Sequence, residues 1–214
     1  AEFTLVDADG NHTPVHLGIP GRHNVMNALA AATVAMRYGM APETVARILA
    51  SQHTISPHRM ALSTVNREGT SFTLIDDSFN ANPDSMKAGL NGLKAWNSND
   101  GKEPFRVALL GAMLELGADE TALHTSIGTY ADELGIDAII AVGSAQDQHL
   151  DALAQALADG ARQSQSASVD CVHDIDAAEQ LVIDLARNHP DAVVLLKGSH
   201  ASGLSALAER WAKN

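Results

Sequence analysis

The sequence predicts an α/β fold in which most strands run parallel. Beyond residue 60, short apolar runs alternate with amphipathic stretches of helical length, which is typical of βαβ units. Strands are expected near residues 61–66, 71–75, 106–110, 138–142, 168–172 and 192–196. Helices are expected near residues 85–96, 120–134, 146–158, 175–188 and 202–213. The first two strands, joined by residues 67–70, could form a hairpin that adds one antiparallel edge.

The first 52 residues read as a separate piece of α/β structure. Residues 1–20 suggest a hairpin. An apolar stretch of strong helix formers follows over 25–38 and ends at Gly39, and Pro42 opens a second helix over 42–51. Residues 53–60 contain a proline and show no periodicity, so they are interpreted as a linker. The predicted domains are therefore 1–60, including the linker, and 61–214.

Composition limits the class of protein. Hydrophobic residues make up 45% of 214 residues, which is enough for a globular core. The formal net charge is −12, and this argues against nucleic acid as a partner, because that interaction needs a basic face. An anionic ligand remains possible where Arg, Lys and helix N-termini hold it locally.

Cysteine usage and hydropathy suggest a cytoplasmic protein. Cys171 is the only cysteine, so no intrachain disulfide can form, and a reducing compartment is expected. Cys171 lies in an expected strand, where a buried thiol is a more ordinary reading than a nucleophile. No segment reaches the ~18 consecutive apolar residues of a membrane span. The first residues also lack the pattern of a signal peptide.

The segment 75–86 carries the most informative polar cluster. Asp76 and Asp77 follow an apolar strand, and Asn80 and Asn82 precede a helix that contains Ser85 near its start. Open α/β sheets bind ligands at this end of their strands, and dinucleotide sites place a ribose-binding carboxylate there. The plainer alternative, a helix cap and a surface carboxylate, fits the two aspartates equally well.

Two further candidates are a polar group before the expected linker and an arginine near its end. His23, Asn24 and Asn27 open the apolar helix, where Asn24 could serve as N-cap and an amide could pair with an adenine edge. The ordinary reading is a cap, a polar contact and a linker histidine. Arg59 could reach a phosphate or ribose between the domains, although such an arginine is usually a surface charge.

Two strand-to-helix turns complete the candidates. The loop 111–117 follows a strongly apolar strand, carries Glu115 as its one charge and precedes a helix with His124. Lys197 and Ser199 follow the last strand, where backbone N–H groups and an ammonium could hold an anion. A simple structural turn explains either segment about as well.

Three kinds of catalytic motif are missing from the sequence. It has no G-x-x-x-x-G-K-[ST] phosphate loop, no paired His or Cys spacing for a metal, and no G-x-S-x-G turn. These 214 residues therefore show no catalytic residues and no metal ligands of their own.

Taken in order, GRHNVMNALAA, DDSFNANPDSMKA, LLGAMLELG and LLKGS resemble the C-terminal half of the Mur ligases of bacterial cell-wall synthesis. The NANPDS stretch resembles the branch that adds D-alanyl-D-alanine. The resemblance covers nearly the whole chain. It implies that residues 1–60 are the end of a central ATP-binding domain plus linker, and that 61–214 form a Rossmann-like C-terminal domain.

The resemblance also implies an activity. The family uses ATP, with Mg²⁺, to phosphorylate a peptide carboxylate, which an amine then attacks. Here the substrates would be a UDP-N-acetylmuramoyl tripeptide and D-alanyl-D-alanine. The phosphate loop and magnesium ligands would belong to N-terminal domains outside these residues, so the chain alone is expected to be inactive.

Residue roles follow from the same resemblance. Nucleotide contacts would come from His23, Asn24, Asn27, Arg59 and Asp77, with the asparagines at adenine and Asp77 at the ribose. Substrate contacts would come from Asn80, Asn82, Ser85, Lys197 and Ser199. Three positions depart from the family pattern, where aspartate, tyrosine and arginine are usual: Ala112, Phe79 and His200.

Two rival functions remain at this point. One is a non-catalytic nucleotide-binding module, suggested by an adenosine-facing set without a phosphate loop. The other is a different amide ligase of the same superfamily, such as the folylpolyglutamate type.

Overall fold

The structure, a computed structural model, describes residues 1–19, 22–52, 58–97, 103–163 and 167–213. The chain divides into two compact units, Ala1–Pro57 and His58–Asn214, which we describe separately. The predicted linker falls mostly at 53–57, outside the described residues. His58, Arg59 and Met60, which the sequence analysis assigned to that linker, belong to the second unit.

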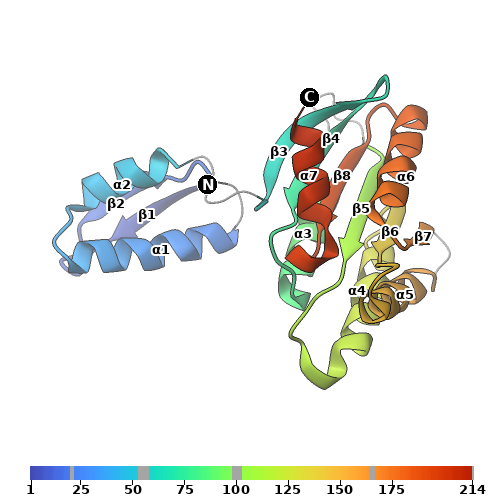
Figure 1. The fold of residues 1–214 in the computed structure, drawn as a ribbon. Helices are drawn as coiled ribbons and strands as arrows, with labels where there is room; N and C mark the ends of the chain where they lie inside the picture. Colours follow the sequence, from blue (N-terminus) through green and yellow to red (C-terminus); the bar gives the residue numbers. More distant parts are fainter. Residues whose placement is uncertain (20–21, 53–57, 98–102, 164–166, 214) are drawn as a thin grey trace. The chain divides into compact units, whose positions relative to one another are not determined.

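The first unit is an antiparallel hairpin packed on two helices (Figure 1). Its elements are β1 (Glu2–Val6), β2 (His12–His16), α1 (Arg22–Arg37) and α2 (Pro42–Ala50). Alternate strand residues such as Leu5 and Val15 turn inward onto Ala32 and Val45. The resulting core is small, as expected for a unit of this length.

Helix α1 corrects one expectation from the sequence. It begins at Arg22, so Asn24 lies within its first turn and is not the N-cap. The preceding residue, where a cap would sit, is outside the described part of the chain. Sequence patterns locate helix boundaries only to within a few residues, and here the helix begins before the expected residue 25.

The second unit is a three-layer α/β domain, as predicted. Its sheet runs in the order β3-β4-β8-β5-β6-β7, with only the β3–β4 pair antiparallel among these six strands. The strands are β3 (Ala61–Arg67), β4 (Thr70–Asp77), β5 (Arg106–Gly111), β6 (Ala138–Val142), β7 (Ser168–Val172) and β8 (Val193–Lys197). The helices are α3 (Pro83–Lys94), α4 (Glu120–Glu133), α5 (Gln148–Ala161), α6 (Ile175–Asn188) and α7 (Leu204–Ala212). Short 3-10 turns occupy Gly117–Asp119 and His200–Ser202.

Both faces of this sheet are covered, which explains why its central strands are apolar throughout. On one face Ala108 and Leu110 pack with α3, α4 and α5. On the other, Val107 and Leu109 pack with α6 and α7, where Phe72 meets Trp211 edge to face at 5.1 Å between ring centroids. Figure 1 shows the helices on either side of the sheet.

Two features bear on expectations from composition. Cys171 lies on β7 and is half-buried, and burial raises the pKa of its thiol, so it is a weak nucleophile at neutral pH. None of the described helices is long and apolar enough to cross a lipid bilayer.

Candidate functional site

The carboxyl end of β8 is the switch point of the sheet. Strand β8 lies between β4 and β5, and these two neighbours are followed by α3 and α4 on one face. Strand β8 is followed by α7 on the other face. Open α/β sheets bind ligands at such a switch point. We call this end of the sheet, marked by Asp77, Lys197 and Ser199, the crevice.

Lys197 and Asp77 meet at this crevice. The parallel register pairs Asp77 with Lys197 across β4 and β8. The Lys197 ammonium donates to Asp77 Oδ2 at 2.6 Å and to the Asn80 carbonyl at 3.2 Å. Lys197 is 1% exposed, so these partners must offset the free-energy cost of burying its charge. Two residues that the sequence assigned to different ligands are thus one ion pair.

A glycine of α3 makes room for the Lys197 stem. A Cβ built on Gly89 would lie 2.8 Å from Lys197 Cδ, closer than real side chains approach. Gly89 therefore allows the lysine to pass along the helix to Asp77. No local sequence pattern indicates this contact, because the two residues are far apart along the chain.

Ser199 is held by its backbone and leaves its hydroxyl without a partner. Its N–H donates to the Ala112 carbonyl at 2.9 Å, and its own carbonyl accepts from Ser202 Oγ at 2.6 Å. Ser199 is 5% exposed, and its Oγ has no hydrogen-bond partner among the described residues. A buried unpaired hydroxyl is costly, and it fits a site where a ligand supplies the partner.

Asp76 has a different role from its neighbour. Its Oδ1 accepts from Ser78 Oγ at 2.6 Å, and its Oδ2 lies 2.8 Å from His58 Nδ1. The other ring nitrogen of His58 lies 3.5 Å from Glu209 Oε1 on α7. Asp76 therefore anchors the start of the second unit. The sequence analysis missed His58, whose partners are distant along the chain.

Arg59 projects over the ring of Phe79, with its guanidinium carbon 4.4 Å from the ring centroid. The backbone ties the same segments together, because Phe79 N–H donates to the His58 carbonyl at 3.1 Å and Met60 N–H donates to Asp77 Oδ1 at 3.3 Å. A phenylalanine in place of the family's usual tyrosine keeps the aromatic face that this cation–π contact needs.

Asn82 and Ser85 form the capping box of α3. Asn82 Oδ1 accepts from Ser85 N at 2.8 Å, and Asn82 N donates to Ser85 Oγ at 3.0 Å. Asn80 Oδ1 accepts from Ala81 N at 2.8 Å. Local structure thus uses all three polar side chains. Their predicted contact with substrate stays a prediction.

The predicted nucleotide residues of the first unit lie on α1. Asn24 is buried and has a polar interaction within the structure, whereas Asn27 is exposed. The side chain of His23 lies outside the described residues. Because the two units are described separately, convergence of Asn24 and Asn27 with Asp77 on one ligand stays a prediction.

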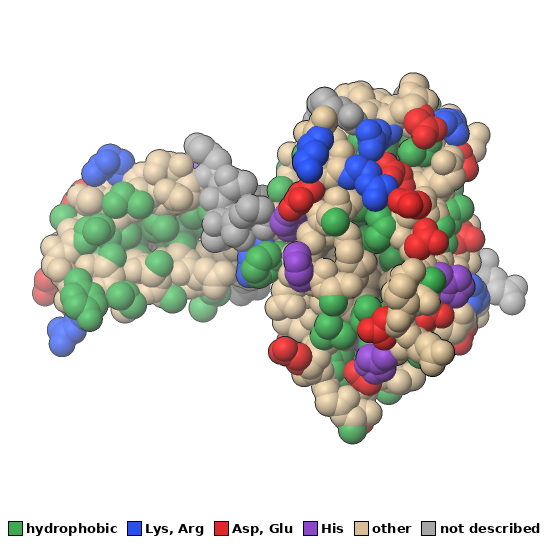
Figure 2. Space-filling model, in the orientation of Figure 1, with side chains coloured by type: hydrophobic (Ala, Val, Ile, Leu, Met, Phe, Trp, Pro, Cys, Tyr) green, Lys and Arg blue, Asp and Glu red, His purple; other side chains and the backbone are tan. Residues whose placement is uncertain are grey.

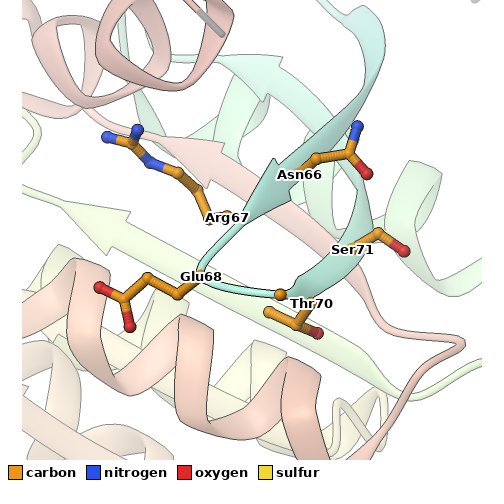
Figure 3. A pocket seen from close by; sticks show the side chains of 6 residues that line it. Asn66, Arg67, Glu68, Thr70 and Ser71 are labelled. Carbon is orange, nitrogen blue, oxygen red and sulfur yellow. The ribbon is translucent and has the colours of Figure 1, made fainter.

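A pocket of about 420 Å³ lies elsewhere, around the β3–β4 turn. It is lined by Asn66, Arg67, Glu68, Gly69, Thr70 and Ser71. In Figure 3 the side chains of Asn66 and Ser71 point to one side of the hairpin and those of Arg67 and Glu68 to the other. The lining groups do not converge, and the turn is at the opposite end of β4 from Asp77. We therefore do not assign the site to this pocket.

Figure 2 shows acidic side chains and histidines spread over the face of the second unit that it draws. Among the described residues, no group of three or more His, Cys, Asp or Glu side chains could hold a metal ion. We assign no magnesium ligand to these residues.

Comparison with known proteins decides the family. The profile of the Mur ligase, glutamate ligase domain matches residues 58–200. The chain belongs to the Mur ligase family. The match spans the crevice from His58, through Asp77 and Lys197, to His200.

Several Mur ligases align beyond that domain. UDP-N-acetylmuramoyl-tripeptide–D-alanyl-D-alanine ligase of Mycobacterium tuberculosis is 39% identical over 213 residues, covering 97% of this chain and 41% of that protein. The enzyme of the same name from Escherichia coli is 35% identical over 142 residues, covering 66% of this chain and 29% of that protein. The chain therefore spans well under half the length of these relatives.

Solved structures agree on the fold. A crystal structure of MurF from Acinetobacter baumannii superposes with a TM-score of 0.75 at 26% identity, covering 100% of this chain and 42% of that one. MurF from Thermotoga maritima in complex with ADP superposes with a TM-score of 0.65 at 20% identity, covering 99% of this chain and 43% of that one, and it supports the fold alone.

Proposed function

We propose that this chain is the C-terminal portion of an ATP-dependent amide ligase that joins D-alanyl-D-alanine to a UDP-N-acetylmuramoyl tripeptide. The observation that carries the proposal is the alignment of 97% of the chain, at 39% identity, with a ligase of that name. The crevice supports it independently, because it combines a charged pair with a buried, unpaired hydroxyl at the switch point of an α/β sheet. Residues 1–52 would be the end of a central ATP-binding domain, followed by the linker, and the reaction would take place in the cytoplasm.

The nucleotide would contact both units. Asn24 and Asn27, with His23, would address adenine, and Arg59 would contact ribose and phosphate. Asp77 would hold the ribose hydroxyls. A carboxylate has about four acceptor positions, so its bonds to Lys197 and to Met60 N–H leave capacity for a ligand.

The two peptides would occupy the rest of the crevice. Asn80, Asn82 and Ser85 at the start of α3 would lie near the incoming dipeptide. Lys197 and Ser199 would lie near the peptide substrate, with the unpaired Ser199 hydroxyl available to its polar groups. His200 stands where the family usually has arginine. Its Nδ1 lies 3.1 Å from Ser205 Oγ. Histidine there removes the fixed positive charge that an arginine would supply.

A chimaeric enzyme tests the activity. The chain is fused behind the N-terminal part of the Mycobacterium tuberculosis relative that precedes the aligned region. With ATP, tripeptide and D-alanyl-D-alanine, mass spectrometry should show the pentapeptide product. Loss of product in Asp77→Asn, with Lys213→Met as an exposed control, would tie the activity to the crevice. A folded chimaera that forms no product would contradict the proposal.

The same preparation separates the rivals. A folylpolyglutamate-type ligase would accept L-glutamate with a folate and leave the dipeptide unused. A nucleotide-binding module would bind ADP to the isolated chain in calorimetry, while its chimaera would form no amide. The isolated chain should release no phosphate from ATP, because no phosphate loop occurs in its sequence.

A further inference from the structure

His124 is a buried titratable group that the proposed chemistry does not use. It lies on α4 with 0% exposure, beside the loop that follows β5. A histidine with no access to solvent must satisfy both ring nitrogens within the protein. Its partners therefore show what it does.

Both partners are backbone groups. His124 Nε2 accepts from Met113 N–H at 2.9 Å, and Nδ1 lies 2.7 Å from the Glu120 carbonyl. A carbonyl can only accept, so Nδ1 carries the hydrogen and Nε2 is the bare acceptor. The geometry thus requires one tautomer of the neutral imidazole.

The loop that His124 holds is part of the crevice. Met113 follows Ala112, whose carbonyl accepts from Ser199 N–H at 2.9 Å. The two loops also meet at their glycines, because a Cβ built on Gly198 would lie 3.0 Å from Gly111 Cα. Hydrogen bonds therefore connect α4, through His124 and the loop after β5, to Ser199.

Protonation would disrupt this support. A second hydrogen on Nε2 would point at Met113 N–H, so a hydrogen bond would become a repulsion in a buried place. Burial lowers the pKa of His124. The backbone and charge of Glu120 act in the opposite direction, and His149 on α5 adds to the lowering. Glu120 Oε1 and His149 Nε2 lie 3.3 Å apart.

We propose that His124 is a positioning residue: as a neutral imidazole it fixes the loop after β5 and, through Ala112, the amide of Ser199, and it releases both on protonation. Its consequence for peptide binding rests on the proposed function, but the coupling between ring and loop does not. It can be measured on the 214-residue chain without substrate.

Amide hydrogen exchange by NMR tests the coupling. Protection of the Met113 and Ser199 amides, corrected for intrinsic rates, is followed as the pH falls from 7.5. The His124 ring is titrated in the same samples. We expect both amides to lose at least fivefold in protection along the His124 titration. If the Met113 amide lost protection and the Ser199 amide did not, the coupling would be overturned. Protection that does not follow the titration of the His124 ring would overturn it as well.

Two variants sharpen the result. In His124→Gln the amide oxygen can accept from Met113 N–H but does not titrate, so protection of both amides should stay constant. In His149→Gln, the nearby exposed histidine is removed and the pH-dependent loss should persist. An unchanged loss in folded His124→Gln would overturn the proposal. The wild-type comparison of ring and amides stands even where that variant does not fold.

Discussion

At the scale of single residues, the crevice depends on contacts that join distant parts of the chain. The sequence singled out Asp77 and Lys197 separately, because each follows a strand and has a chemically useful side chain. The structure pairs them at 2.6 Å. The sequence contains no local signal for such a pair, since the strand order that brings them together is a property of the whole sheet.

The Asp77–Lys197 pair leads to a stability prediction. Lys197→Met should destabilise the second unit by about 3 kcal/mol, because it leaves the Asp77 carboxylate without its charge partner. The value lies at the low end for buried pairs, since the Asp77 side chain keeps 17% of its surface exposed. Urea unfolding measures the change. Lys213→Met, at an exposed lysine, is the control and should change stability by less than about 0.5 kcal/mol.

A double-mutant cycle with Asp77→Asn isolates the interaction. The double variant should be more stable than the sum of the two single changes predicts, because neither partner is then left buried and charged. Strict additivity would show that the pair contributes nothing to folding.

The state of His124 predicts how stability changes with pH. Its pKa is lowered in the folded chain from an ordinary value of 6.5. As the pH falls below about 6.5, the unfolded chain takes up a proton that the folded chain refuses, so the free energy of unfolding decreases. The loss continues until the pH reaches the folded-state pKa.

Thermal unfolding between pH 8 and pH 5 measures this slope. His124→Gln should flatten it relative to wild type, because glutamine does not titrate. His149→Gln provides the comparison at an exposed site. Equal slopes in wild type and His124→Gln would show that other groups dominate the acid dependence.

At the scale of elements, helices and strands follow sequence patterns closely, but their packing distances do not. The strand prediction for 138–142 and the helix prediction for 175–188 match the observed β6 and α6. Such elements can be predicted from the sequence because they are apolar runs or amphipathic stretches. The close packing of α4 against α5 cannot be predicted in this way, because it depends on two glycines whose contacts are tertiary.

Gly128 and Gly160 lie where α4 and α5 touch. A Cβ on Gly128 would lie 1.9 Å from the Leu157 carbonyl oxygen, and one on Gly160 would lie 2.0 Å from that of Thr125. Gly128→Ala should therefore push the helices apart and destabilise the second unit by about 2 kcal/mol, despite the higher helix propensity of alanine.

Gly92→Ala is the matched control for this change. Its Cβ would meet only the flexible end of Met60, at 3.3 Å. Propensity should then dominate, and stability should rise by up to about 1 kcal/mol. Chemical denaturation of both variants gives opposite signs if backbone contact decides the first case. A stable Gly128→Ala would contradict the packing argument.

At the scale of the whole molecule, the two units differ greatly in core size. The second has apolar clusters on both faces of its sheet, whereas the first has two small clusters around its hairpin and helices. In the first unit Met26, Val34 and Tyr38 of the α1 region are 64%, 58% and 88% exposed. Figure 2 shows several hydrophobic side chains on the face of the first unit that it draws.

We therefore expect the units to unfold separately. Native-state hydrogen exchange should give lower opening free energies for amides of β1, β2 and α1 than for those of β5, β6 and β8, because a small core offsets less conformational entropy. The central strands of the second unit should open only with its global unfolding. A single opening free energy shared by all these strands would contradict the division.

Periodicity, turn residues and short motifs are local properties of the chain, so the sequence was enough to predict the class of fold, the order of its elements and the resemblance to the Mur ligases. It also placed the candidate polar residues at strand ends. The folded structure was needed to show that β8 inserts between β4 and β5, which makes Lys197 a partner of Asp77. It alone revealed the buried His124 and the glycines that admit close packing. These features depend on contacts between residues that are distant along the chain, and no local sequence pattern predicts such contacts.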